Sequence, residues 1–194
     1  MKSVEFHFDY RSPYAYLALT QFGKLPAEVR YCPFDIAELM KKVENVPTSV
    51  VCPAKNRYVG KDLARWAGRY GVPFARHPQA AAIDARRLLR ATLAADRLGA
   101  MPLAVTAIYQ ARWASPAPLS TAEEIAALLG RAGMDAERLL PLIDDAALDQ
   151  SLDAATEAAA ARGVFGAPTF FIEDDMFFGN DRLDFVRDRL GEPR

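Results

Sequence analysis

The sequence carries β-strand patterns near its two ends and none through its long middle. Residues 4–8 alternate apolar and polar side chains, which is typical of a strand with one buried face. Near the other end, residues 169–172 and 176–178 are short apolar runs on either side of an acidic turn, which predicts a hairpin. Residues 37–163 show no convincing strand. We therefore expect an α/β chain whose sheet is assembled from both ends around a large all-helical insertion.

A helix start follows the first strand. Ser12 is a good N-cap residue, Pro13 suits the first helical turn, and Gly23 stops the helical pattern. Residues 29–34 then have the pattern of a second strand. A helical connection of this length allows two strands to lie side by side and parallel.

The middle of the chain is rich in helical patterns. Apolar residues recur at helical spacing in residues 62–70 and 80–98, and an alanine-rich helix is expected over residues 149–162. Ser120 and Glu123 have the spacing of a capping box, which predicts one more helix start.

Composition excludes several classes of protein. A hydrophobic share of 51% with 25% charged residues is ordinary for a globular chain and argues against disorder. The net charge of −1 and the lack of basic clusters argue against nucleic acid or a membrane as partner. Charged residues interrupt the N-terminal stretch, and no segment approaches the roughly 20 apolar residues of a membrane span. We therefore expect a cytoplasmic, small-molecule enzyme.

The cysteines and histidines do not form a recognisable metal or catalytic pattern. Cys32 and Cys52 are too few and too irregularly placed for a disulfide framework or a zinc site, and we expect both to be packing residues. His7 and His77 are expected to be structural or surface residues, which leaves no evident base for a hydrolytic serine.

Several polar positions are candidate site residues, each with a plainer alternative. Ser12 is either a simple helix cap or part of a helix N-terminus that stabilises an anion in a cleft. Pro168 belongs at or just before a strand, as a rigid turn or after a cis bond from Ala167. Asn180 and Asp181 suit a helix N-cap, and the alternative is that they bind the charged end of a peptide ligand.

The segment from residue 45 to residue 58 has no regular pattern, and we interpret it as a loop. It contains an amide, a lysine and a tyrosine in Asn45, Lys55 and Tyr58. A loop of this length is either a lid over a site or a solvated segment, and the pattern alone leaves both open.

Five segments in order resemble one family over nearly the whole chain. They are FDYRSPYAYLA at residues 8–18, the 45–47 and 55–62 segment, LARWAGRYGVPF at 63–74, GVFGAPTFF at 163–171 and FFGNDRL at 177–183. Together they resemble the 2-hydroxychromene-2-carboxylate isomerases and the kappa-class glutathione transferases of the DsbA-like thioredoxin superfamily.

The resemblance implies a thioredoxin-like domain of residues 1–36 and 164–194, a helical insertion domain of residues 37–163, glutathione as cofactor and a homodimer. Ser12 then looks like the catalytic serine, whose hydroxyl donates a hydrogen bond to the glutathione sulfur. The resemblance also implies that Asn45, Lys55 and Tyr58 contact glutathione or substrate. The Ala167 backbone, before a cis Pro168, would pair with the cysteinyl part of glutathione. Asn180 and Asp181 would bind its γ-glutamyl end.

Serine at this position has a chemical consequence. In redox relatives a C-x-x-C pair would occupy Ser12 and Ala15, and neither is a thiol here, so the thiol must come from the ligand. The expected reaction is reversible addition of the glutathione thiolate to a conjugated carbon of an aromatic substrate, with Lys55 meeting a carboxylate or oxyanion. The alternative is a kappa-like transferase that conjugates glutathione to electrophiles. A more distant alternative is a non-redox, thioredoxin-like peptide-binding protein.

Overall fold

The computed structural model describes residues 2–191, with the backbone alone at positions 48 and 49. Its centre is a four-stranded sheet in the order β2-β1-β3-β4. The strands are β1 (Ser3–Phe8), β2 (Glu28–Pro33), β3 (Thr169–Ile172) and β4 (Asp175–Phe178). β1 pairs with β2 in parallel and with β3 antiparallel, and β4 completes the hairpin with β3. The prediction of a sheet assembled from both ends is confirmed.

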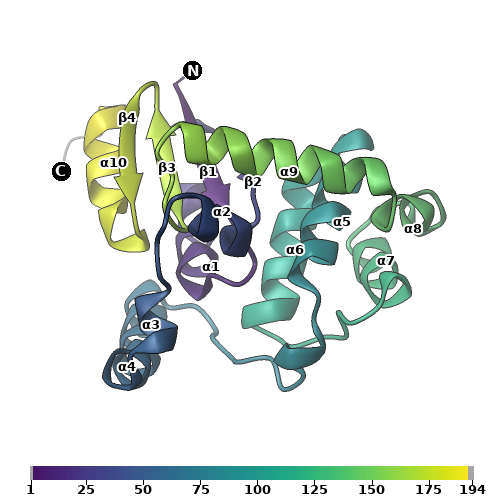
Figure 1. Ribbon diagram of the computed structural model, residues 1–194, viewed down its shortest axis with the longest axis horizontal. Coiled ribbons are helices and arrows are strands. Elements are labelled where there is room, and N and C mark those ends of the chain that lie inside the picture. Colours follow the sequence, from purple (N-terminus) through teal and green to yellow (C-terminus); the bar gives the residue numbers. More distant parts are fainter. Residues whose placement is uncertain (1, 192–194) are drawn as a thin grey trace.

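Helices connect and cover this sheet (Figure 1). α1 (Pro13–Leu19) joins the two parallel strands, and α10 (Leu183–Leu190) follows the hairpin. Between β2 and β3 lie α2 (Ile36–Lys42), α3 (Thr48–Val51), α4 (Pro53–Tyr70), α5 (Ala85–Arg97), α6 (Met101–Trp113), α7 (Ala122–Arg131), α8 (Ala136–Ile143) and α9 (Ala146–Ala161). Short 3-10 turns occur at Phe22–Lys24, Ala80–Ala82 and Asn180–Arg182. No strand is found within residues 37–163, as predicted.

Three details of the helical prediction are wrong. The segment expected as a loop is mostly helical, because α3 and α4 begin at Thr48 and Pro53. The capping box lies one residue later, where the Thr121 hydroxyl accepts from the Glu124 N–H at 3.2 Å and the Glu124 carboxylate accepts from the Thr121 N–H. The helix expected from residue 80 starts instead at Ala85, capped by Asp84.

One aromatic core joins the sheet to the helical insertion. The Phe6 ring stacks on those of Phe8 and Phe170, with centroids 5.1 and 5.6 Å apart. Phe8 in turn contacts Tyr109 of α6 at 5.8 Å. All four rings are fully buried, so the core continues from the strands into the inserted helices. The division into domains at residues 36/37 and 163/164 stays a prediction.

The opposite face of the sheet carries a polar cluster. Glu5, His7 and Cys32 offer potential metal ligands within 4.8 Å of one another, the one such group among the described residues. Arg30 and Arg162 already bind the Glu5 carboxylate. Burial raises the pKa of the Cys32 thiol to about 11, so this group stays neutral. Two cations and a protonated thiol make the cluster a poor site for a metal ion, and we interpret it as packing.

His7 gives a prediction about stability and pH. Burial lowers the pKa of its imidazole, against the opposing effect of the Glu5 carboxylate. The unfolded chain therefore takes up a proton on His7 at a higher pH than the folded chain does, and folding stability falls as the pH drops below about 6.5. We expect His7→Gln to reduce the loss of unfolding free energy between pH 7.5 and pH 5.5, measured by urea titration. An equal loss in the variant and the wild type would contradict this assignment.

Candidate active site

Ser12 lies where β1 delivers the chain to the start of α1. Its backbone is extended, and its hydroxyl oxygen accepts a hydrogen bond from the Ala15 N–H at 3.2 Å. Its hydroxyl hydrogen is donated to the Ala167 carbonyl at 2.8 Å. The side chain is thus the helix cap that the sequence predicted, and it also touches the loop before β3. With 7% of its surface exposed, Ser12 lies just beneath the surface.

Buried hydrogen bonds from α6 hold the turn before Ser12. The Tyr109 hydroxyl donates to the Asp9 carbonyl at 3.0 Å, and the Trp113 indole donates to the Tyr10 carbonyl at 2.9 Å. The Ser12 N–H donates to the same Asp9 carbonyl at 2.9 Å. The insertion therefore fixes the direction in which β1 presents Ser12.

Asp9 and Asp35 tie the same turn to the rest of the molecule. The Asp9 carboxylate accepts from the backbone N–H groups of Arg11 and Ile36, at 2.7 and 2.9 Å, and from the Arg11 guanidinium. Burial raises the pKa of Asp9, and Arg11 opposes that shift. Asp35 caps α2 and also binds Arg11 and Arg86, at 3.1 and 3.3 Å.

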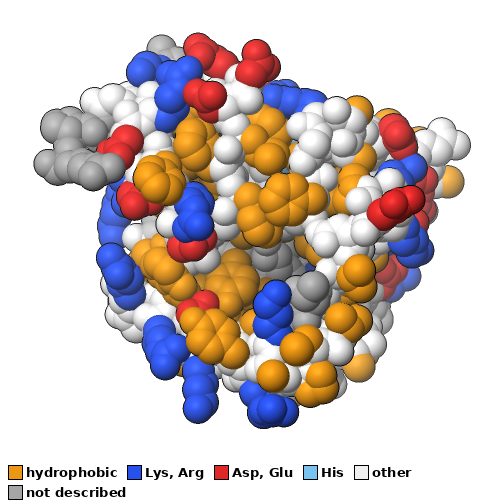
Figure 2. All heavy atoms as spheres, turned by 60° about the vertical axis from the view of Figure 1, so that its left-hand side comes forward, with side chains coloured by type: hydrophobic (Ala, Val, Ile, Leu, Met, Phe, Trp, Pro, Cys, Tyr) orange, Lys and Arg blue, Asp and Glu red, His pale blue; other side chains and the backbone are white. Residues whose placement is uncertain are grey.

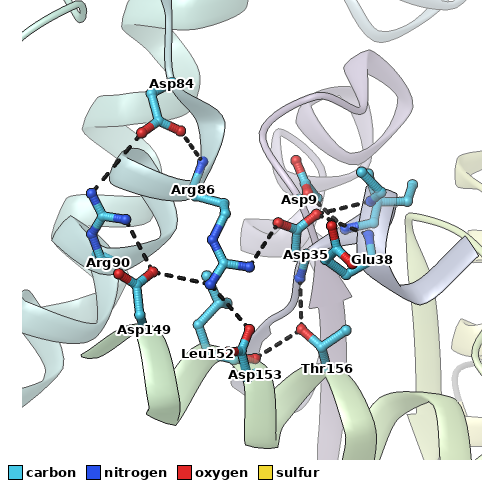
Figure 3. A network of polar contacts seen from close by, with 12 residues as sticks. Asp9, Asp35, Glu38, Asp84, Arg86, Arg90, Asp149, Leu152, Asp153 and Thr156 are labelled. Atoms are coloured by element: carbon cyan, nitrogen blue, oxygen red, sulfur yellow. Dashed lines mark hydrogen bonds and ion pairs between the residues drawn. The ribbon is translucent and has the colours of Figure 1, made fainter. Parts of the chain in front are cut away.

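Figure 3 shows how this network extends into the insertion. Arg86 of α5 bridges Asp35 to Asp149 and Asp153 of α9, each at 3.0 Å. The Asp35 N–H donates to the Thr156 hydroxyl at 3.0 Å. Two inserted helices thus anchor the start of α2, which lies beside the turn before Ser12.

The loop before β3 forms the other wall of the site. The peptide bond between Ala167 and Pro168 is cis, the second of the two alternatives that the sequence left open. The Pro168 carbonyl accepts from the Gly179 N–H at 2.9 Å, which joins this loop to the turn after β4. Gly179 has φ of 106°, a backbone conformation that residues with a Cβ rarely adopt, so this turn requires glycine.

A cleft of about 490 Å³ opens between these walls. Its lining comes from Tyr14 of α1, from Tyr58, Asp62 and Trp66 of α4, and from residues 167–168 and 178–181. Figure 2 shows hydrophobic side chains and scattered Lys and Arg around a hollow on this side of the molecule. Two residues of this lining, Tyr58 and Phe178, are exposed large hydrophobic side chains.

A larger hollow, of about 680 Å³, lies between α1, β2 and α6. It is lined by groups such as Tyr16, Tyr31 and Gln110, and none of the described side chains lining it is acidic or basic. The smaller cleft contains Asp62 and Asp181, and its lining includes Ala167, whose carbonyl accepts from the Ser12 hydroxyl. Ser12 itself is not part of the lining. We therefore place the candidate active site in the smaller cleft.

The model of the DSBA-like thioredoxin domain family matches residues 3–191. The chain belongs to this family. The chain is similar to a 2-hydroxychromene-2-carboxylate isomerase of Sphingobium xenophagum, with 31% identical residues over 97% of this chain and 98% of the relative. A glutathione S-transferase kappa 2 of Caenorhabditis elegans is 30% identical over 99% and 93% of the two chains. A solved structure of 2-hydroxychromene-2-carboxylate isomerase superposes with a TM-score of 0.87 at 30% identity, covering 97% and 94%.

In this DsbA-like chain, Ala167, Pro168, Asn180 and Asp181 all line the cleft, as does Tyr58. Asn180 is 3% exposed, and its side-chain nitrogen has no hydrogen-bond partner among the described residues. Neither Asn180 nor Asp181 makes the side-chain cap bond that was the plainer interpretation.

Asn45 and Lys55 lie outside the cleft lining. The Asn45 amide donates to the Phe165 carbonyl at 2.8 Å, so it touches the loop before Pro168 from behind. Lys55 is exposed on the first turn of α4, in a helix where a loop was expected.

Cys52 is exposed at the N-cap of α4, which corrects the expectation that it is a packing residue.

The sequence interpretation singled out Tyr58 but missed the other residues on the same face of α4. Tyr58, Asp62, Trp66 and Tyr70 recur every four residues and so lie along one side of the helix. The Tyr70 hydroxyl donates to the Asn180 carbonyl at 3.1 Å, and Asp62 accepts from Tyr14. The spacing was visible in the sequence, but its start was hidden by treating residues 45–58 as a loop.

The part of the chain from residue 2 to residue 191 has no helix with the length and apolar character needed to cross a membrane.

Proposed function

We propose that this protein is a glutathione-dependent isomerase. It interconverts 2-hydroxychromene-2-carboxylate and trans-o-hydroxybenzylidenepyruvate, or a related aromatic catabolite, by reversible thiolate addition. The observation that carries the proposal is a hydroxyl group at a helix N-terminus that opens beside an aromatic cleft, with no thiol at residue 12 or 15. The names of the similar isomerases support the choice of substrate.

Ser12 would favour the thiolate form of glutathione. A thiol with a pKa near 8.5 is only about 3% ionised at pH 7. The helix N-terminus contributes about 0.3–2 kcal/mol toward an anion, and a hydrogen bond to a charged group about 1.5–3 kcal/mol. A net shift of one to two pKa units is therefore within reach, since about 1.4 kcal/mol equals one unit. To donate to sulfur, the Ser12 hydroxyl must leave the Ala167 carbonyl that it now binds.

The remaining proposed contacts follow the walls of the cleft. The Ala167 backbone beside Pro168 pairs with the cysteinyl part of glutathione, and Asn180 and Asp181 bind its γ-glutamyl end. The amide nitrogen of Asn180 is buried and has no hydrogen-bond partner within the described part of the chain, which supports this role. We assign Tyr58 to the aromatic substrate. Lys55 and Asn45 lie outside the cleft lining, and their proposed roles, with Lys55 meeting the substrate carboxylate, rest on the resemblance alone.

The reaction consumes no cofactor. The thiolate adds to the conjugated carbon next to the aromatic ring, and the former double bond becomes single as its electron pair moves toward the ketone to form an enolate; collapse of that enolate later expels the thiolate. After rotation about that bond, the thiolate leaves and the double bond forms again in the trans arrangement. The protein's part is to hold the thiolate, orient the ring against α4 and exclude water.

A kappa-like transferase that conjugates glutathione to electrophiles is the second candidate, supported by the similarity to the kappa 2 transferase. A non-redox peptide-binding protein that uses the groove beside Pro168 is the distant one. The resemblance also supports a cytoplasmic homodimer. Analytical ultracentrifugation tests the oligomeric state, and cell fractionation tests the location.

We expect purified protein to isomerise 2-hydroxychromene-2-carboxylate only when glutathione is present, because the chain supplies no thiol at the site. Glutathione is catalytic in this reaction, so its concentration, measured by a thiol reagent, should stay constant over many turnovers. Stoichiometric loss of glutathione with an electrophile such as 1-chloro-2,4-dinitrobenzene, without isomerisation, would favour the transferase. Absence of glutathione binding in calorimetry would favour the peptide-binding protein.

A further inference from the structure

Asp62 lies between two tyrosine hydroxyl groups inside the candidate active site. The Tyr14 hydroxyl donates to one carboxylate oxygen at 2.8 Å, and the Tyr58 hydroxyl donates to the other at 3.2 Å. All three side chains line the cleft together with Ala167, whose carbonyl binds Ser12. The cluster therefore shares one cleft with the residue that binds the Ser12 hydroxyl.

We propose that Asp62 and Tyr14 form a proton relay that opens the chromene ring before the thiolate adds. This inference rests on the proposed function. It assigns a separate step of the same reaction to side chains that the sequence did not single out as site residues.

Ring opening requires a proton to move between two oxygen atoms. The substrate is a cyclic hemiketal, because its C2 atom carries both a hydroxyl group and the ring oxygen. When the bond from C2 to the ring oxygen breaks, the hydroxyl group loses its proton and becomes the ketone oxygen. The ring oxygen keeps the bonding electrons and takes up a proton to become a phenol. No proton is gained or lost overall.

The Asp62 carboxylate accepts the proton from the C2 hydroxyl, and Tyr14 gives its own proton to the ring oxygen. Asp62 then returns a proton to Tyr14 along the hydrogen bond that already joins them. An ionised carboxylate has about four lone-pair positions, so Asp62 can accept from substrate while it holds both tyrosines. The closed ring holds the double bond cis, so thiolate addition and rotation can follow only after this step.

The electrostatics of the cluster fit this assignment. Burial and the Asp62 carboxylate raise the pKa of Tyr14, so its phenol is protonated at neutral pH and can act as a donor. The second carboxylate in the cleft, Asp181, is paired with the Arg182 guanidinium. Asp62, in contrast, accepts hydrogen bonds from two neutral tyrosine hydroxyl groups. A carboxylate with such partners is suited to exchange protons with a bound hydroxyl group.

The test compares two substrates that differ in the ring-opening step. One is 2-hydroxychromene-2-carboxylate; the other is cis-benzylidenepyruvate, which has the same double bond but no ring to open. We expect Asp62→Asn and Tyr14→Phe to lower kcat for the chromene by roughly 100-fold, in the range of general acid–base catalysis, after subtraction of uncatalysed opening. Both variants should keep wild-type turnover of cis-benzylidenepyruvate within about threefold, because thiolate addition does not use the relay.

Tyr16→Phe is the matched control. It also removes a tyrosine hydroxyl from α1, but that hydroxyl donates to the Pro73 carbonyl and lies outside the cleft. It should leave both activities unchanged. The cis-benzylidenepyruvate activity of the variants also reports whether they are folded.

Equal losses on both substrates would show that the cluster only holds α4 against α1, and would overturn the relay. Unchanged turnover of the chromene would overturn it as well. The proposed function fails separately, if the wild-type protein shows no glutathione-dependent turnover of either substrate.

Discussion

We expect Ser12→Ala to lower kcat by roughly 10- to 150-fold, the loss of one hydrogen bond to a charged group of about 1.5–3 kcal/mol. The affinity for glutathione should change by less than about threefold, because the bond strengthens only when the thiol ionises. Steady-state kinetics of isomerisation and calorimetric titration with glutathione measure the two effects. An ultraviolet thiolate band for bound glutathione, shifted to higher pH in the variant, provides a direct check.

The same substitution also removes a helix cap, which must be separated from catalysis. The Ser12 hydroxyl accepts from the Ala15 N–H, and loss of such a cap costs about 1 kcal/mol of stability. Asp135→Ala is the matched control, because Asp135 caps α8 in the same way with a bond of 3.1 Å to the Arg138 N–H. It should lose similar stability and keep full activity. A Ser12→Ala variant with an unchanged rate would remove Ser12 from the mechanism.

The second large effect is expected for Arg86→Ala, which should reduce the free energy of unfolding by about 2–4 kcal/mol. Arg86 binds the Asp35 carboxylate, whose side chain is 2% exposed, and also two aspartates of α9. Its removal leaves a buried charge with less compensation and frees α5 from the start of α2. For a chain of this size each 1 kcal/mol lowers Tm by about 2–4 °C, so the shift should reach roughly 4–16 °C.

Arg97→Ala is the corresponding control on the same helix. Arg97 pairs with Asp145 at 2.8 Å, and both side chains are about a third or more exposed. An exposed pair of this kind is worth about 0–1 kcal/mol, so its loss should shift Tm by a few degrees at most. Equal Tm values for the two variants would show that the bridge to Asp35 adds nothing beyond a surface contact.

β1 was predictable from sequence because apolar and polar side chains alternate along it. Phe6 and Phe8 alternate with Glu5 and His7, and the buried and polar sides of β1 follow that alternation. α4 was predictable only in part, for a related reason. Its first turns, from Pro53 to Tyr58, are exposed throughout, so no apolar periodicity marks them as a helix.

The position of the candidate site in the fold was predictable where the ends of strands and helices meet. Ser12, Ala167, Pro168, Asn180 and Asp181 follow or precede strands of one sheet, so topology brings them together. Asp62 was not predictable in this way, because its role depends on how α4 packs against α1. The contact between Asp62 and Tyr14 joins residues 48 positions apart on two helices, and no local pattern encodes it.

The order of the strands has a consequence for synthesis of the chain. β1 lies in the middle of the sheet, but its partner β3 comes far later in the sequence, with Glu5 opposite Phe171. While the ribosome makes the insertion, β1 is an edge strand with unpaired backbone groups and an uncovered aromatic face. The inserted helices meet near neighbours, such as α7 and α8, and can pack sooner. We therefore expect the nascent chain to depend on chaperones until β3 and β4 have emerged and can pair with β1.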